Sequence, residues 1–164
     1  AHILILVDVA SRYVVTKPLP DMKEHTVARA LFEIFTIFGP PKIMQSDRGK
    51  EFINKILAKL TESAGIDHRL VAPFNPQANG LAERTVQTVK AALKKKLEGK
   101  YDRWDDALPA ATWAINTHEH KLTKTAPFTL FFSRSANSWD DYSVDKISFQ
   151  RSDAAARSAI NRAE

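Results

Sequence analysis

Two carboxylates in this sequence, Asp47 and Glu83, have surroundings suited to holding a divalent cation, and 35 residues lie between them. Asp47 follows the short apolar run Ile43–Met44, where a buried strand is predicted to end. Functional residues of open α/β sheets usually stand at this end of a strand. Carboxylate oxygens are the hard ligands that Mg²⁺ prefers. The alternative for Asp47 is a plain turn residue, because the surrounding Ser-Asp-Arg-Gly sequence favours a tight turn.

Glu83 lies near the start of a predicted amphipathic helix that follows a turn-rich segment, residues 72–80. At 100° per residue, Gln87, Lys90 and Lys94 fall within about 40° of Glu83 on the helix surface. An apolar seam roughly a quarter turn away is predicted to be buried, and it consists of Ala82, Val86, Val89, Leu93 and Leu97. An acid followed by cations on one face suits a site for a metal ion and a polyanion. The alternative is a surface helix with solvated charges.

Hydrophobic periodicity places these residues in a series of strands and helices. Apolar runs rich in β-branched residues predict strands, and apolar residues at i, i+4, i+7 and i+8 predict helices. Strands are predicted at 3–7, 13–16, 42–45 and 67–71, and helices at 23–38, 51–64, 81–97, 104–117 and 125–132. The first two strands form an antiparallel hairpin, whereas the strand–helix–strand section requires a right-handed crossover and parallel pairing. The predicted fold class is therefore α/β, a mixed sheet with helices on its faces.

The composition limits the kinds of protein that this sequence can encode. Its 164 residues are enough for one domain, and 44% of them are apolar, which can fill a core. No window approaches the length of a membrane span, so no membrane partner is expected. The absence of Cys excludes a disulfide framework and a Cys-containing zinc site. The net charge of +5 favours anionic partners, and positive residues cluster at Lys90, Lys94, Lys95, Lys96, Lys100 and Arg103.

Five blocks of this sequence carry a specific pattern. The blocks read LVDVASRYVVTKPL, GPPKIMQSDRGKEF, APFNPQANGLAERTVQTVK, WDDALPAATWAINTHEH and KTAPFTLFF, and together they cover most of residues 3–133. In this order, and with 35 residues between Asp47 and Glu83, the chain resembles the catalytic core of integrases from retroviruses and gypsy-type LTR retrotransposons. The resemblance implies a ribonuclease H-like fold. It also implies DNA integration, with 3′-end processing and strand transfer of element DNA into host DNA by two-metal phosphoryl transfer.

The resemblance further implies roles for individual residues. Asp47 would be the second and Glu83 the third of three acids that hold two Mg²⁺ or Mn²⁺ ions. One ion would activate the attacking water or DNA 3′-hydroxyl, and the other would stabilise the leaving 3′-oxygen. Residues 74–80 resemble the flexible active-site loop of the family. The positions that face DNA in relatives are occupied here by Asn79, Gln87, Lys90 and Lys94.

Asp8 is not expected to be the first of the three acids. In this family an Asp followed by a Ser-Arg-Tyr-type turn is not a metal ligand, so Asp8 is predicted to accept hydrogen bonds near the hairpin turn. The family's first acid lies one strand earlier, on the central strand that joins the hairpin to the parallel pair. We therefore expect residues 1–134 to be an integrase core truncated at its N-terminal side and inactive alone. Residues 135–164 are expected to be a linker toward an absent C-terminal domain.

The partners implied by the resemblance are element ends and target DNA, further copies of the chain in a homo-oligomer, and no membrane. The implied place of action is the nucleus, reached through a cytoplasmic particle. Two other functions stay open: a domesticated or decayed integrase-like domain that binds DNA or protein without catalysis, and a different ribonuclease H-like nuclease. Retention of Asp47 and Glu83 argues against decay, and the block at Asn75–Arg84 argues against another nuclease. Mg²⁺-dependent nicking of DNA separates an enzyme from a binding domain.

Overall fold

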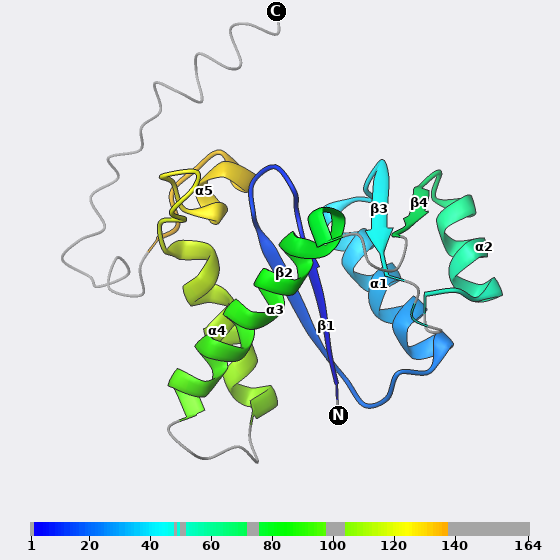
Figure 1. Ribbon diagram of the computed structural model, residues 1–164, viewed down its shortest axis with the longest axis horizontal. Helices are drawn as coiled ribbons and strands as arrows, with labels where there is room; N and C mark the ends of the chain where they lie inside the picture. Colours follow the sequence, from blue (N-terminus) through cyan, green and yellow to red (C-terminus); the bar gives the residue numbers. More distant parts are fainter. Residues whose placement is uncertain (1, 48, 50–51, 72–75, 98–103, 138–164) are drawn as a thin grey trace, which may run out of the picture. The chain divides into compact units, whose positions relative to one another are not determined.

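Strands and helices follow one another in the predicted order (Figure 1). The computed structural model describes residues 2–47, 49, 52–71, 76–97 and 104–137, and of residues 76–79 only the backbone. By its internal contacts the chain divides into residues 1–134 and 135–164, and positions 138–164 of the predicted linker lie outside the described residues. The elements are β1 (His2–Val7), β2 (Val14–Leu19), α1 (Glu24–Phe38), β3 (Ile43–Ser46), α2 (Lys55–Ser63), β4 (Asp67–Leu70), α3 (Pro76–Leu97), α4 (Trp104–Thr117) and α5 (Pro127–Phe132).

β1 and β2 form an antiparallel hairpin that is covered by helices on both faces. Successive side chains of a strand point to opposite faces. In β1, Leu4 and Leu6 pack into a core with α1. The opposite face packs into a second core with α3 and α4 through Ile3, Ile5 and Val7. The continuous apolar run at residues 3–7 predicts a strand that is buried on both faces, and the packing of β1 confirms this prediction.

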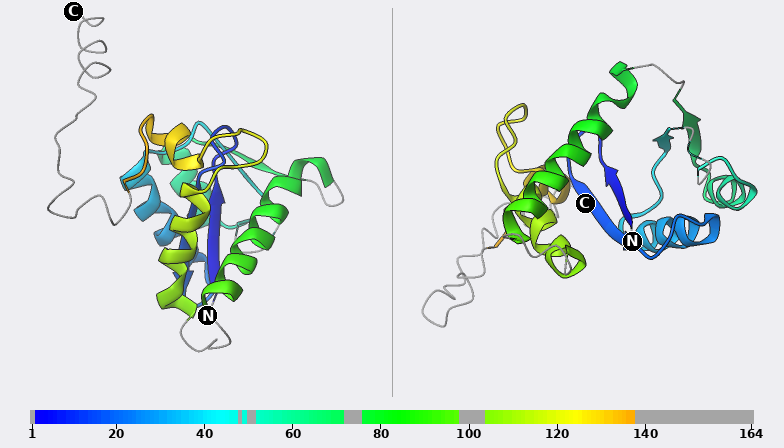
Figure 2. Two further views of the ribbon diagram at one scale, coloured as in Figure 1. Left: turned by 90° about the vertical axis from the view of Figure 1, so that its left-hand side faces the viewer. Right: turned by 60° about the horizontal axis from the view of Figure 1, so that its bottom comes forward.

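β3 and β4 form a second sheet, a parallel pair that is separate from the hairpin (Figure 2). Among the described residues, the second edges of β1 and β3 have no strand partner. The predicted mixed sheet is thus not continuous. The crossover through α1 does not by itself explain the separation, because β3 and β4 are also connected through a helix, α2, and still pair with each other. The expectation that the hairpin and the parallel pair need a joining strand agrees with this arrangement.

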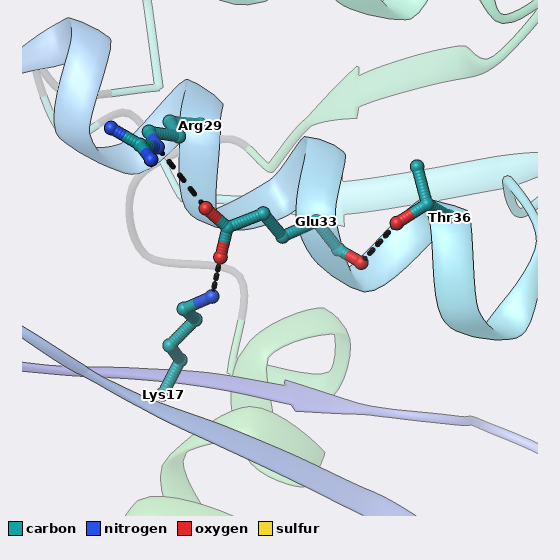
Figure 3. Close-up of polar contacts among 4 residues, drawn as sticks. All are labelled: Lys17, Arg29, Glu33 and Thr36. Carbon is teal, nitrogen blue, oxygen red and sulfur yellow. Dashed lines mark hydrogen bonds and ion pairs between the residues drawn. The ribbon is translucent and has the colours of Figure 1, made fainter.

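Helix α1 is attached to the rest of the fold mainly by apolar packing. Leu31, 2% exposed, lies in one core with Leu57 of α2, which is fully buried. On the helix surface, the Glu33 carboxylate pairs with Lys17 Nζ of β2 and, at 3.1 Å, with Arg29 Nε one turn earlier (Figure 3). Ion pairs that are this exposed contribute at most about 1 kcal/mol each. The buried leucines therefore stabilise the helix more than the charges do.

A buried asparagine fastens α4 to the edge of β2 that faces away from β1. Asn116 is 3% exposed. Its Oδ1 accepts a hydrogen bond from Val14 N at 2.8 Å, and its Nδ2 donates to Val14 O at 2.7 Å. Next along the strand, the hydroxyls of Thr16 and Thr112 lie 2.6 Å apart. The amide of Asn116 thus makes the two bonds that the backbone of a neighbouring strand would make.

Helix α2 begins later than the periodicity predicts. The apolar periodicity predicts a start at residue 51, but α2 begins at Lys55. Asn54 has an extended backbone, and its side chain accepts a hydrogen bond from Leu57 N at 2.8 Å. Asparagine is a strong N-cap because this bond satisfies one of the unpaired N–H groups of the first turn. The capping residue, rather than the apolar pattern, sets the start.

Helix α3 begins earlier than predicted, at Pro76 rather than after Gly80. Proline suits the first turn of a helix, because its φ is already helical and its missing N–H would be unpaired there. Residues 76–80 of the predicted active-site loop are therefore helical, and residues 72–75 lie outside the described residues. α3 has 22 residues, yet none of the described helices is long and apolar enough to cross a membrane.

Candidate active site

Asp47 stands directly after β3, at the carboxyl end of the strand, where the sequence predicts it. Its side chain is exposed, and Oδ1 accepts a hydrogen bond from Gly49 N at 2.9 Å. Asp47 therefore does form the tight turn that the alternative interpretation predicts. Within the described part of the chain, Oδ2 has no hydrogen-bond or ion-pair partner. One oxygen therefore accepts the hydrogen bond of the turn, and no described residue occupies the other.

Glu83 lies in the first half of α3 with an exposed carboxylate. No described residue forms a hydrogen bond or ion pair with this carboxylate. Gln87, Lys90 and Lys94 are also exposed, as their predicted position on one stripe with Glu83 requires. Asn79 belongs to the same helix, but its side chain lies outside the described residues. The helix thus presents one acid followed by one amide and two cations to solvent.

The buried seam of α3 differs from the prediction at its N-terminal end. Val89, Leu93 and Leu97 are buried in the core with α4, as predicted. Ala82 is exposed, however, and Thr85 is buried instead. The Thr85 hydroxyl donates to Leu81 O at 2.8 Å, so its burial leaves no polar group unpaired. This seam anchors the helix that carries Glu83.

The two acids provide a partial donor set for a divalent cation. The described residues contain no group of three or more His, Cys, Asp or Glu side chains that could hold a metal ion. Asp47 and Glu83 nevertheless each keep at least one carboxylate oxygen without a partner among those residues. Mg²⁺ is usually held by one or two carboxylates together with water and substrate phosphates. The chemistry of each of these two side chains is therefore that of a Mg²⁺ ligand.

Asp8 serves the hairpin turn, as predicted. Its Oδ2 accepts hydrogen bonds from Ser11 N at 2.7 Å and from Ser11 Oγ at 2.6 Å. Its carbonyl accepts from Arg12 N at 2.9 Å. Ser11 is buried, so its donors have lost water and need partners within the protein. A single carboxylate oxygen of Asp8 accepts the hydrogen bonds of both donors.

Replacing Asp8 by Ala is expected to lower the free energy of unfolding by about 1–2 kcal/mol, because two hydrogen bonds to a charged acceptor are lost. Urea denaturation followed by circular dichroism measures this change. Asp8→Asn keeps an acceptor oxygen and is expected to lose less stability. Both variants are expected to keep the wild-type Mn²⁺ affinity. A loss of that affinity in Asp8→Asn would make Asp8 a metal ligand and contradict its assignment to the turn.

Two residues beside Asp47 were not predicted to belong to the site. Ser46 ends β3, and its Oγ lies 2.9 Å from Nε2 of His68 on β4. Burial of the ring lowers the pKa of His68. The parallel register sets Met44 opposite His68, which brings Ser46 and the ring to the same face. The sequence shows a histidine in a predicted strand, but it does not show the register that brings it beside Asp47.

The sequence is similar to integrase cores. Residues 1–76 match the family described as Integrase core domain. Over 134 residues the chain is 31% identical to Gypsy retrotransposon integrase-like protein 1 of Bos taurus, covering 82% of this chain and 27% of that protein. The chain therefore spans about a quarter of the length of the curated relatives that it matches first.

The fold is similar to that of retroviral integrases, which are ribonuclease H-like. The simian T-cell lymphotropic virus intasome, in complex with PP2A regulatory subunit B56 gamma, superposes with a TM-score of 0.74 at 23% identity, over 83% of this chain and 50% of that one. The catalytic core domain of HTLV-2 integrase in complex with magnesium superposes with a TM-score of 0.66 at 21% identity, over 77% of this chain and 82% of that one. The predicted fold class is thereby confirmed.

Proposed function

We propose that this chain, which is similar in sequence to a gypsy retrotransposon integrase-like protein and in fold to retroviral integrase cores, is the catalytic core of a DNA integrase. The proposed reactions are 3′-end processing of element DNA and its strand transfer into host DNA, both of them phosphoryl transfers. The supporting observation is the pair of exposed carboxylates, Asp47 after β3 and Glu83 in α3, with cations behind Glu83. We further propose that the chain acts as an oligomer on element ends in the nucleus.

Asp47 and Glu83 are the residues that would hold the divalent cations. Held there, the ions would supply activation of the attacking oxygen and stabilisation of the leaving 3′-oxygen. The bond from Gly49 N fixes one oxygen of Asp47, which restricts the side chain without consuming the second oxygen. Val89 and Leu93, both buried, hold α3 in place and so limit the movement of Glu83. The chain's own contribution is thus to preorganise two negative ligands before metal and DNA arrive.

Lys90 is the residue best placed to bind a DNA phosphate, because it lies two turns beyond Glu83 on the same exposed stripe. Lys90→Ala is expected to weaken the binding of all DNA sequences alike and to lower the salt slope of the affinity by about one. Fluorescence anisotropy of a labelled duplex across a salt series measures both quantities. Lys95→Ala is the matched control, because Lys95 is exposed but lies about 120° away from Glu83 around the helix. An unchanged slope in Lys90→Ala would exclude the phosphate contact.

Gln87, Lys94 and Asn79 are proposed to extend the same DNA-binding surface. Gln87 and Lys94 flank Lys90 on the stripe and are exposed. Asn79 lies one turn before Glu83 in α3. Contacts from these side chains would fix the register of the DNA against the two acids, since phosphate contacts position a duplex without reading its sequence.

The proposed function is tested by binding of the 164-residue chain to a blunt DNA duplex with Mg²⁺ and without it, at equal ionic strength. Mg²⁺ is expected to tighten binding, because the two acids and the DNA phosphates share the cation. Equal affinity with and without Mg²⁺ would favour a DNA-binding domain without catalysis.

A further inference from the structure

One pair of side chains joins the carboxyl end of β3 to β4. Ser46 Oγ lies 2.9 Å from His68 Nε2. The same hydroxyl donates to the carbonyl oxygen of Asp47 at 3.1 Å. Ser46 and His68 are both half-buried, whereas Asp47 is exposed. The serine thus connects a ring on β4 to the backbone of the residue that is proposed to bind metal.

The direction of these two bonds follows from the single proton of a serine hydroxyl. Because Ser46 gives that proton to the carbonyl of Asp47, its oxygen accepts from His68. His68 therefore carries a proton on Nε2. Burial lowers the pKa of His68 and so favours the neutral ring. In that ring the proton is on Nε2, and Nδ1 carries none. Hydrogen bonds linked in series in this way polarise and strengthen one another.

We propose that His68 is a positioning residue for Asp47 and acts through Ser46. The serine holds the backbone carbonyl of Asp47, and Gly49 N holds its Oδ1, so that the residue is fixed at two points. Oδ2 is then presented in a single orientation. This inference rests on the proposed metal-binding role of Asp47. Side chains that orient a ligand from outside the coordination shell typically change metal affinity by roughly 10–100-fold.

The pairing of β3 with β4 does not depend on this contact. The two strands are already held in register by backbone bonds from Ile43 opposite Asp67 to Ser46 opposite Leu70. A single half-buried hydrogen bond adds only about 0.5–1.5 kcal/mol to stability. Removing the ring is therefore expected to change the orientation of Asp47 more than it changes the folding of the domain.

The first test uses the chain without metal, so its result does not depend on the proposed function. In ¹H–¹⁵N NMR spectra, His68→Ala is expected to shift the amide resonance of Gly49, which reports the bond to Asp47. Ser46→Ala is expected to shift it in the same way. The ¹⁵N shifts of the wild-type His68 ring are expected to show the Nε2–H tautomer, and Ser46→Ala is expected to reduce its population. An unmoved Gly49 resonance in His68→Ala would overturn the proposal.

The second test is Mn²⁺ affinity, measured by water-proton relaxation. His68→Ala is expected to lower the affinity about tenfold or more. His68→Gln, whose amide reaches the position of Nε2, is expected to restore most of it. Arg69→Ala is the matched control, because Arg69 is the next residue of β4 and pairs instead with Asp67, at 2.6 Å. This control is expected to bind Mn²⁺ as the wild type does.

The outcomes separate the two proposals. A loss of affinity in His68→Ala with an unchanged urea midpoint, together with recovery in His68→Gln, supports the positioning role. Equal losses in His68→Ala and Arg69→Ala, or no recovery in His68→Gln, contradict it. If the wild-type chain binds no Mn²⁺, the proposed function is wrong. The role of His68 is then tested only by the shift of the Gly49 amide resonance in His68→Ala.

Discussion

Asp47→Asn and Glu83→Gln are each expected to lower the Mn²⁺ affinity of the chain by at least about tenfold. Each substitution keeps the size of the side chain and removes one negative charge. A pair of unit charges 4 Å apart interacts by about 1 kcal/mol in water and about 4 kcal/mol near a protein surface, and about 1.4 kcal/mol corresponds to a factor of ten. Titration of Mn²⁺ followed by water-proton relaxation measures the affinity. Both side chains are exposed, so stability is expected to change by less than about 0.5 kcal/mol.

The matched control for these variants is Glu62→Gln, which removes an exposed carboxylate from α2. It is expected to bind Mn²⁺ with wild-type affinity. The double variant Asp47→Asn/Glu83→Gln shows whether the acids share an ion, because residues with a common partner give non-additive losses and independent sites give additive ones. Wild-type affinity in either single variant would remove that residue from the proposed site.

Asn116→Ala is expected to lower the free energy of unfolding by about 2–4 kcal/mol. The substitution removes two buried hydrogen bonds and leaves the N–H and C=O of Val14 without partners, each of which costs about 1–3 kcal/mol when it stays dry. Water that enters the space left by the side chain would pair with part of these groups, so the expected loss of stability is smaller than the sum of the two costs. Urea denaturation measures the loss, and the slope with denaturant shows whether unfolding remains two-state.

Two further substitutions test whether the amide itself stabilises the contact. Asn116→Asp keeps the shape of the side chain but replaces the donor facing Val14 O by an acceptor, so it is expected to be at least as destabilising as Asn116→Ala. Glu119→Ala, an exposed position just beyond α4, is expected to change stability by less than about 0.5 kcal/mol. An Asn116→Asp variant as stable as wild type would mean that the bonds to Val14 contribute little.

Features that depend on neighbouring residues could be predicted from the sequence. The continuous apolar run at 3–7 predicts a strand covered on both faces, and the structure packs its two faces into two cores. The turn after β3 and the stripe behind Glu83 are also local, and both acids lie where their surroundings place them. The predicted starts of α2 and α3 are wrong because one residue outweighs the apolar pattern in each case: the N-cap Asn54 for α2 and the first-turn proline Pro76 for α3.

Contacts between distant segments could not be predicted in this way. Asn116 and Val14 are separated by 102 positions, and their bonds exist only once α4 has packed on the hairpin. Ser46 and His68 meet only because β3 and β4 pair in parallel with one particular register. A shift of one residue would turn the ring of His68 to the other face. The supporting part of the candidate site therefore depends on tertiary structure, whereas its two acids are visible in the sequence.

The outer edge of β2 is protected against the addition of another chain. Val14, Thr16 and Pro18 stand opposite residues of β1 to which they are not hydrogen-bonded, so their backbone polar groups point outward. Asn116 occupies both groups of Val14, and Pro18 has no N–H to donate. Only Thr16 then has both its N–H and its C=O open to pairing on this edge. One residue is too short a stretch to pair with another strand. The buried amide of Asn116 and the missing N–H of Pro18 therefore prevent another strand from pairing with this edge of the hairpin, which protects it against edge-to-edge aggregation.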